Sequence, residues 1–218
     1  MKPILYVGNQ NYSSWSLRPF LLLTWGRIDF DMQLIRLGGE GYTKRQIKEV
    51  LAVSPSGTVP ALRVGDDVVT DSLAIAEWAA EQVPTLWPAE PMTRALARSA
   101  ACEMHSGFGA LRSELPCNIR RRAEPRTFSD DVKREVARVE EIWSSLTRRF
   151  AGLYLFGKEP TIADAFYTPV ATRFRTYGVT LSADAQRYSD VVLGNPAFRE
   201  WEDAAKREEW TMPYWDSV

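Results

Sequence analysis

Residues 83–91, VPTLWPAEP, separate two parts of the chain that have different sequence patterns. The segment carries three prolines in nine residues, a density typical of a linker because proline lacks the backbone N–H that helices and strands use. Strand-like apolar runs occur before it, and long helical patterns follow it. The sequence therefore predicts a mixed α+β domain over residues 1–83, a linker over 84–91 and an all-helical domain over 92–218.

The part before the linker alternates strand and helix patterns. The run PILYV (3–7) is continuously apolar and ends at a glycine, which suits a strand buried on both faces. The patterns then predict, in order, a helix over 16–26, a strand over 29–37, a short helix over 43–53, a hairpin over 60–70 and a helix over 72–83. This β-α-β-α-β-β-α order is that of a thioredoxin-like domain, whose sheet mixes parallel and antiparallel pairs.

The part after the linker has helical patterns throughout. We expect helices over 93–115, 129–151, 161–175 and 195–208. Ser129 suits the N-cap of the second of these helices, and Thr161 with Asp164 forms a T-x-x-D capping box at the start of the third. We expect the aromatic tail, 208–218, to pack back onto this helical domain.

Composition argues against several classes of protein. The 218 residues are 45% hydrophobic with a formal net charge of −1, which gives no reason to expect nucleic-acid binding. No apolar run approaches the roughly 20 residues of a membrane helix, and the N-terminus lacks a signal-peptide pattern, so we expect a cytoplasmic protein. Two cysteines without CxxC spacing and a single histidine, His105, argue against a disulfide framework and a zinc site. The arginine run at 120–122 is either a solvated turn or the rim of an anion site.

Four local segments, taken in order, resemble those of one family. They are YSSWSLR (12–18), SPSGTVPAL (54–62), TDSLAI (70–75) and TIADAF (161–166). Together with the predicted domains, they make the chain resemble the cytosolic glutathione transferases, in particular the serine-type, zeta-like and bacterial members. The resemblance covers essentially the whole chain. It implies glutathione as co-substrate, no metal or other cofactor, a small electrophile as second substrate, and a homodimer.

The resemblance implies that a serine at the start of the first helix ionises the glutathione thiol. Lowering a thiol pKa from about 8.5 by two units takes roughly 2.7 kcal/mol of preferential thiolate stabilisation. A hydroxyl that donates to sulfur beside a helix N-terminus can supply much of this. Ser13 aligns with the family's catalytic serine and is our choice of donor, with Ser14 as the alternative, and Ser14 or Ser16 would then cap the helix. From the residues alone, all three are caps or turn residues.

Two further segments would hold the peptide backbone of glutathione. Val59 and Pro60 match the family's cis pair, which would turn the Val59 backbone toward the cysteinyl moiety. Asp71 and Ser72 precede a helix, so from the residues alone they form an ordinary N-cap. The resemblance adds that Ser72 holds the γ-glutamyl carboxylate, which the helix N-terminus also favours, and that Asp71 holds the ammonium group.

Two positions depart from the family pattern. Thr58 stands where the family often has lysine or glutamine before V-P, so the contact to the glycyl carboxylate could pass to Arg36, Lys44 or Arg45. Trp15 stands where zeta-class isomerases carry a cysteine, which argues against maleylacetoacetate isomerase activity. The tryptophan would pack against the first helix or form a wall of the site.

The second substrate would lie against the helix predicted over 93–115. Met104, His105 and Phe108 could line its pocket, and packing in the core is the alternative for these three. Arg112 could attract an anionic co-substrate. Two other functions stay open beside glutathione conjugation. One is a glutathione-dependent isomerase of the maleylacetoacetate isomerase type, and the other is a non-catalytic interaction protein with a transferase fold.

Overall fold

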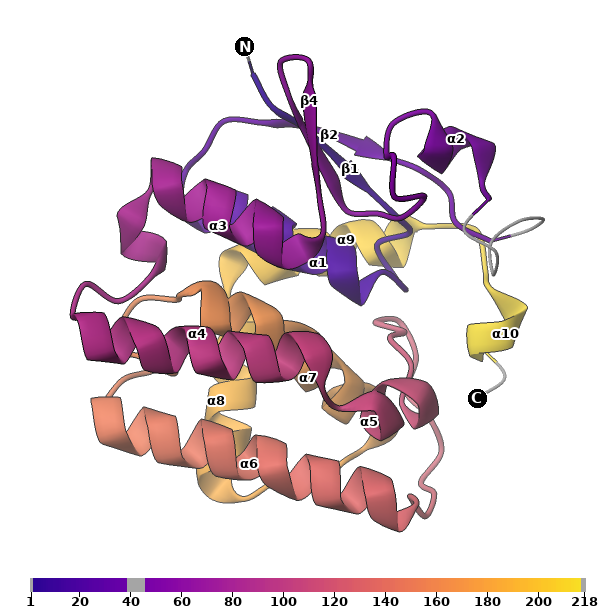
Figure 1. Ribbon diagram of the computed structural model, residues 1–218. Coiled ribbons are helices and arrows are strands. Elements are labelled where there is room, and N and C mark those ends of the chain that lie inside the picture. Colours follow the sequence, from indigo (N-terminus) through magenta and orange to yellow (C-terminus); the bar gives the residue numbers. More distant parts are fainter. Residues whose placement is uncertain (1, 39–45, 217–218) are drawn as a thin grey trace.

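The computed structural model describes residues 2–38 and 46–216, apart from the side chain of Tyr214. A sheet with its helices occupies one end of the molecule, and a group of helices occupies the other (Figure 1). The predicted fold class is confirmed, because an α+β thioredoxin-like domain is followed by an all-α domain. The 3-10 helix η2 (Pro84–Leu86) lies within the segment that we propose as the linker.

The four-stranded sheet has the strand order β2-β1-β3-β4. Its strands are β1 (Ile4–Val7), β2 (Asp31–Leu34), β3 (Ala61–Val64) and β4 (Asp67–Thr70). Strand β1 pairs in parallel with β2 and antiparallel with β3, and β3 forms the predicted hairpin with β4. Central strand β1 is buried over its last three residues, as its apolar run predicts. The turn that follows β1 therefore starts from a fixed point in the core.

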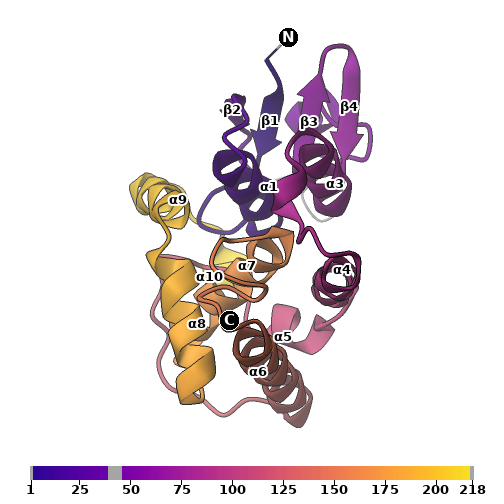
Figure 2. The ribbon, with the colours of Figure 1, turned by 90° about the vertical axis from the view of Figure 1, so that its left-hand side faces the viewer.

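Helices of the first domain cover this sheet, and the others form the second domain. The first set is α1 (Ser14–Trp25), α2 (Lys48–Leu51) and α3 (Ser72–Gln82). The second set is α4 (Pro91–Ser106), α5 (Gly109–Glu114), α6 (Asp130–Phe150), α7 (Ile162–Tyr177), α8 (Ala183–Gly194), α9 (Pro196–Arg207) and α10 (Pro213–Asp216). Figure 2 shows α7 beneath α1 and beside α4, with α9 also beside α1. The domains therefore meet where α1 packs on α7 and α9.

Helix α7 is buried along almost its whole length, and the predicted capping box fixes its start. The carboxylate of Asp164 is fully buried and accepts from Thr161 N at 2.8 Å, Leu155 N at 2.9 Å and the Tyr188 hydroxyl at 3.1 Å. Burial raises the pKa of Asp164 to about 6, although these donors act in the opposite direction. A buried helix start with paired polar groups lets α7 run through the core to the domain junction.

One helix prediction is wrong in detail, and one helix was not predicted. The pattern over 93–115 is not one helix, because Gly107 ends α4 in an extended conformation and Phe108 adopts a left-handed one before α5. The close approach of the Glu103 carbonyl, 2.7 Å from where a Cβ on Gly107 would lie, explains why glycine stands at this break. Helix α8 was not predicted, although Ala185, Tyr188 and Val192 bury one face at helical spacing.

The C-terminal tail packs on the helical domain, as the sequence predicts, and it also contacts the first domain. Helix α10 places the Asp216 carboxylate 2.7 Å from Asn118 Nδ2, in the helical domain, and 2.9 Å from the Tyr12 hydroxyl, in the first domain. The tail therefore bridges the turn after β1 to the second domain. Within the described residues, no helix is long and apolar enough to cross a membrane.

Candidate active site

The turn between β1 and α1 brings two serine hydroxyls into contact. Ser13 is the N-cap of α1, because its Oγ accepts the Ser16 N–H at 3.3 Å. The Ser13 hydroxyl also donates to Ser16 Oγ at 2.8 Å, and Ser16 Oγ accepts the Gly8 N–H at 3.0 Å. The capping role that we expected of Ser14 or Ser16 thus falls to Ser13. This hydroxyl lies at the N-terminus of α1, where unpaired N–H groups and the helix dipole favour negative charge.

Ser14 lies on the side of the helical domain and has a different partner. Its Oγ accepts from Arg173 Nη2 at 3.0 Å. Arg173 belongs to α7, is nearly buried, and donates from Nη1 to the Leu115 carbonyl at 2.5 Å. Burial lowers the pKa of this guanidinium, but arginine remains charged in proteins. A positive group from the second domain therefore lies against the start of α1.

The cis-proline segment lies directly beside the serine turn. The Val59–Pro60 peptide bond is cis, as the resemblance predicts. A Cβ on Gly8 would lie 3.2 Å from Val59 Cγ2, so the beginning of the serine turn and Val59 are in close contact. The structure therefore brings together two of the segments predicted to hold glutathione, and their contact with the ligand stays a prediction.

The third predicted segment is joined to α1 by a buried arginine. Asp71 is the N-cap of α3 and accepts the Leu73 N–H at 2.7 Å. It has a φ of 76°, a left-handed conformation that is costly outside glycine and that concentrates at ligand-binding sites. Ser72 is 1% exposed, and its Oγ accepts from Arg18 Nη1 at 3.3 Å. Arg18, from α1, thus connects the starts of α1 and α3.

Trp15 lies among cationic side chains. The guanidinium carbons of Arg18 and Arg112 lie 4.1 and 5.0 Å from its ring centroid, and His105 packs edge-on at 5.4 Å. His105 Nε2 is 3.3 Å from the Asp71 carboxylate. Burial lowers the pKa of His105, although the Asp71 carboxylate acts in the opposite direction. Burial also lowers the pKa of Arg18, and repulsion from Arg112 lowers it further. The structure therefore brings four predicted residues, Trp15, Asp71, His105 and Arg112, to one place.

The other two predicted pocket residues lie in the hydrophobic core. Met104 is almost fully buried, and Phe108, also buried, borders an open groove between α4, α5 and α6. Arg112 is anchored to the same turn, because its Nη2 donates to the carbonyls of Met104 and His105. Packing is thus the observed role of Met104 and Phe108.

Of the residues considered for the glycyl carboxylate, Thr58 and Arg36 lie among the described residues. Thr58 is half-buried, and its Oγ1 lies 2.7 Å from Ser56 Oγ. The guanidinium of Arg36 stacks 5.8 Å from the ring centroid of Trp210. Lys44 and Arg45 lie outside the described residues. Among residues 2–38 and 46–216, no group of three or more histidine, cysteine, aspartate and glutamate side chains could hold a metal ion.

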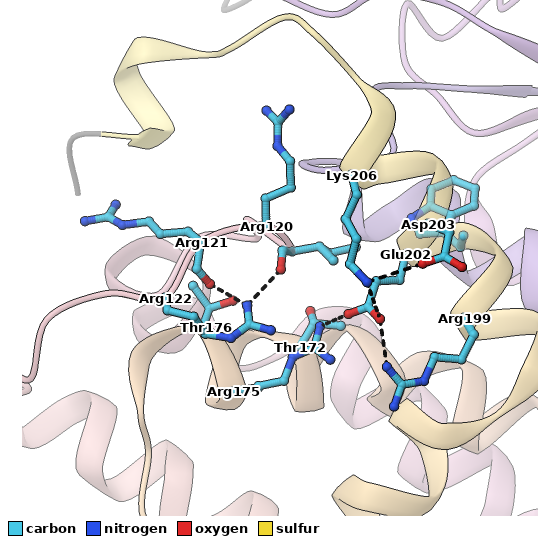
Figure 3. Close-up of polar contacts among 12 residues, drawn as sticks. Arg120, Arg121, Arg122, Thr172, Arg175, Thr176, Arg199, Glu202, Asp203 and Lys206 are labelled. Carbon is cyan, nitrogen blue, oxygen red and sulfur yellow. Dashed lines mark hydrogen bonds and ion pairs between the residues drawn. The ribbon is translucent and has the colours of Figure 1, made fainter.

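The arginine run at 120–122, considered as a solvated turn or the rim of an anion site, makes internal contacts, and Arg122 is exposed. The Arg120 guanidinium donates to the carbonyls of Glu208 and Trp210, the latter at 3.0 Å. Arg122 donates to the carbonyls of Ile119 and Arg121, at 3.0 and 2.7 Å (Figure 3). These side chains therefore tie the run to the tail and to its own turn.

A buried glutamate balances the cations beside this run. Glu202 of α9 is 1% exposed and lies 2.5 Å from Arg175, 2.9 Å from Arg199 and 3.2 Å from Lys206 (Figure 3). Burial alone would raise the pKa of Glu202, but Arg175 and the other cations hold it below its usual value. The cationic side chains on this face thus share a carboxylate partner.

Two arginines of the site were not predicted. Arg18 is the last residue of the YSSWSLR segment, so a sequence signal existed, but it does not reveal that the side chain reaches Ser72. The sequence around Arg173 gives no sign of a site residue, because a single arginine in a helical pattern is common. The place of Arg173 beside Ser14 depends on how the two domains pack.

Comparison with known proteins identifies the family behind these features. Residues 12–82 match the sequence model of the glutathione S-transferase N-terminal domain, and residues 129–204 match that of the C-terminal domain. The chain belongs to the glutathione S-transferase family. The two matches fall on the sheet domain and on the helices α6 to α9, so both domains of this transferase carry the family pattern.

Individual relatives of this transferase carry different activities in their names. Maleylpyruvate isomerase of Ralstonia is 30% identical, over 89% of this chain and 97% of the relative. A zeta-class glutathione S-transferase of Euphorbia esula is 30% identical, over 77% of this chain and 75% of the relative. The crystal structure of a glutathione transferase homologue from Burkholderia, solved with bound glutathione, has a TM-score of 0.69 at 21% identity, covering 95% and 100% of the two chains. The last likeness shows the shared fold.

Proposed function

We propose that this protein is a glutathione transferase that ionises glutathione with a serine hydroxyl and presents the thiolate to a small electrophile. One observation carries the proposal. In this member of the family, Arg18 joins the start of α1 to the start of α3. One start holds the hydroxyls of Ser13 and Ser14, and the other holds Asp71 and Ser72. A thiolate at the first and a carboxylate at the second would both meet helix N-termini.

Ser13 is the proposed donor to sulfur. Ser16 Oγ already accepts from Gly8 N–H, so rotation of the Ser16 hydroxyl would let it donate to Ser13. Ser13 Oγ would then accept two hydrogen bonds, from Ser16 N–H and Ser16 O–H, and direct its own proton at the sulfur. Hydrogen bonds in such a chain strengthen one another. The thiol proton leaves to solvent, and the thiolate forms the carbon–sulfur bond as it adds to the electrophile or displaces its leaving group.

Glutathione itself would lie along the three segments. The γ-glutamyl carboxylate would meet Ser72 and the start of α3, and its ammonium would meet Asp71, whose carboxylate is half-exposed. The backbone of Val59 would pair with the cysteinyl moiety. The electrophile would lie against Trp15, His105 and Arg112 on the side of the helical domain.

The proposal is tested by titrating the purified protein with glutathione in a calorimeter and by following thiolate absorbance against pH. We expect binding and a thiol pKa for bound glutathione clearly below the free value of about 8.5. No binding at millimolar glutathione would instead favour the non-catalytic interaction protein. Binding without a lowered thiol pKa would contradict serine-assisted ionisation.

A glutathione-dependent isomerase is the second candidate. Arg18, Arg112 and Arg173 bring three guanidinium groups to the site, which favours an anionic second substrate. A relative named maleylpyruvate isomerase agrees with this, whereas Trp15 in place of the zeta-class cysteine argues against it. Assays with an unsaturated cis-enone diacid and with a halogenated aromatic compound separate the two activities.

Assembly and location are proposed from the family. We propose a homodimer in the cytoplasm, with glutathione as co-substrate and no metal or organic cofactor. Light scattering on the purified protein measures the mass directly, and a value of one chain rather than two would contradict the dimer.

A further inference from the structure

The loop that leads into Ser13, residues 9–12, is held at Gln10 and Asn11 by the other domain, while Asn9 bonds to Leu37 of its own domain. Trp201 Nε1 donates to the Gln10 carbonyl at 2.8 Å, and the Ile119 N–H donates to the Asn11 carbonyl at 3.1 Å. The Asn11 side chain accepts the Arg120 N–H at 2.9 Å through Oδ1. Loops usually lie at the surface with their polar groups in water, whereas this loop has buried partners from distant parts of the chain.

Two consecutive backbone N–H groups of this loop share one carboxylate. Glu208, directly after α9, accepts the Gln10 N–H at 2.5 Å with one oxygen and the Asn11 N–H at 3.1 Å with the other. Its side chain is only 6% exposed. Hydrogen bonds in which the acceptor is charged are roughly twice as strong as neutral ones. Two consecutive N–H groups are thereby fixed in one orientation.

The segment around Glu208 is itself held by hydrogen bonds to other parts of the chain. Arg120 donates to the Glu208 and Trp210 carbonyls, and Asp216 of α10 accepts the Tyr12 hydroxyl. Residues 205–216 lie beyond the match to the C-terminal family domain, which ends at 204. The contact between Glu208 and the loop is therefore a feature of this chain that the family match does not assign.

The loop transmits this contact to the proposed active site. The N–H groups of Tyr12 and Ser13 both donate to the Asn9 carbonyl, at 3.1 and 2.8 Å, so the loop closes as a tight turn at the serine. Any rotation of the Gln10 and Asn11 peptides would move Ser13 relative to Val59 and Ser72. A misplacement of about 1 Å can cost 10²-fold in rate.

We propose that Glu208 is a positioning residue for catalysis, which holds the loop 9–12 so that the Ser13 hydroxyl meets the glutathione sulfur. The inference rests on the proposed function. Glu208 does not touch the substrate. It acts through two backbone N–H groups, and the carboxylate is suited to this because both of its oxygens accept.

The test compares Glu208→Gln with Glu209→Gln, which removes the same charge from the exposed neighbouring residue. An amide offers one oxygen, and its NH₂ group would face the second N–H of the loop. We expect Glu208→Gln to raise the thiol pKa of bound glutathione and to lower kcat about tenfold, with little change in KM for the electrophile. Glu209→Gln should behave as the wild type in all three measurements.

Measurements well below the unfolding temperature separate positioning from stability. If Glu208→Gln is less stable but keeps the wild-type thiol pKa and kcat, Glu208 is structural only and the inference is overturned. If that variant does not fold, Glu208→Asp is used instead, because it keeps the charge on a shorter side chain. An unchanged thiol pKa of glutathione bound to Glu208→Asp would likewise overturn the inference. Failure of the wild type to lower the thiol pKa overturns the proposed function itself and, with it, this inference.

Discussion

Ser13→Ala is expected to raise the thiol pKa of bound glutathione by about 1.5 units, which is most of the lowering we propose, and to lower conjugation at neutral pH by about 10- to 100-fold. The alanine removes the hydroxyl at the N-terminus of α1 while leaving the helix dipole and Arg173 in place, so part of the thiolate stabilisation remains. Binding of glutathione should weaken much less, because Val59, Asp71 and Ser72 are unaffected. Thiolate absorbance against pH, with calorimetry at neutral pH, measures the two effects separately.

Ser14→Ala is the matched control for this prediction. It removes the same group, a serine hydroxyl, at the next residue. In the described structure this hydroxyl accepts from Arg173 and is not hydrogen-bonded to Ser16. We expect a smaller rise in the thiol pKa. If Ser14→Ala abolishes conjugation while Ser13→Ala leaves it intact, the donor is Ser14, and the Arg173 guanidinium would be its direct support. Loss of the Ser13 cap costs about 1 kcal/mol of stability, so both variants should be compared at a temperature where they are folded.

The fold could be predicted because its signals are local. The apolar run before Gly8, the hairpin over 60–70, the three prolines of the linker and the T-x-x-D capping box each act within a few residues. The break at Gly107 was missed because helical spacing continues across it, and only the approach of the Glu103 carbonyl requires a glycine there.

The site could be predicted only in part, because many of its contacts join distant segments. The serines, the cis pair and Asp71-Ser72 belong to short motifs, so the sequence names them as candidates, and the cis bond and the Asp71 cap are confirmed. The partners of these motifs were not. Arg173 lies 159 residues after Ser14, and Glu208 lies 198 residues after Gln10. In sequence both are ordinary helix-end or helix-face charges, and their contacts arise from the packing of α7 and α9 on α1.

The start of α7 is the position where we expect a substitution to cost the most stability. Asp164→Ala is expected to lower the free energy of unfolding by about 3–5 kcal/mol, because it leaves the buried donors of Leu155, Thr161 and Tyr188 without an acceptor. Asp130→Asn is a suitable control, since Asp130 lies in the first turn of α6 but is largely exposed. There we expect at most about 0.5 kcal/mol. Urea unfolding of both variants measures the difference.

The pH dependence of this effect has a definite sign. Burial raises the pKa of Asp164 to about 6, above the value of about 3.9 for an aspartate in the unfolded chain. The folded state therefore binds the proton more readily, so the stability due to this shift is complete below the unfolded pKa and is lost as pH rises through about 6. Asp164→Ala removes the group, and its destabilisation should be larger at about pH 5 than at about pH 7.5. An equal loss at both values would mean that the hydrogen bonds to the carboxylate outweigh its burial and keep Asp164 ionised throughout this range.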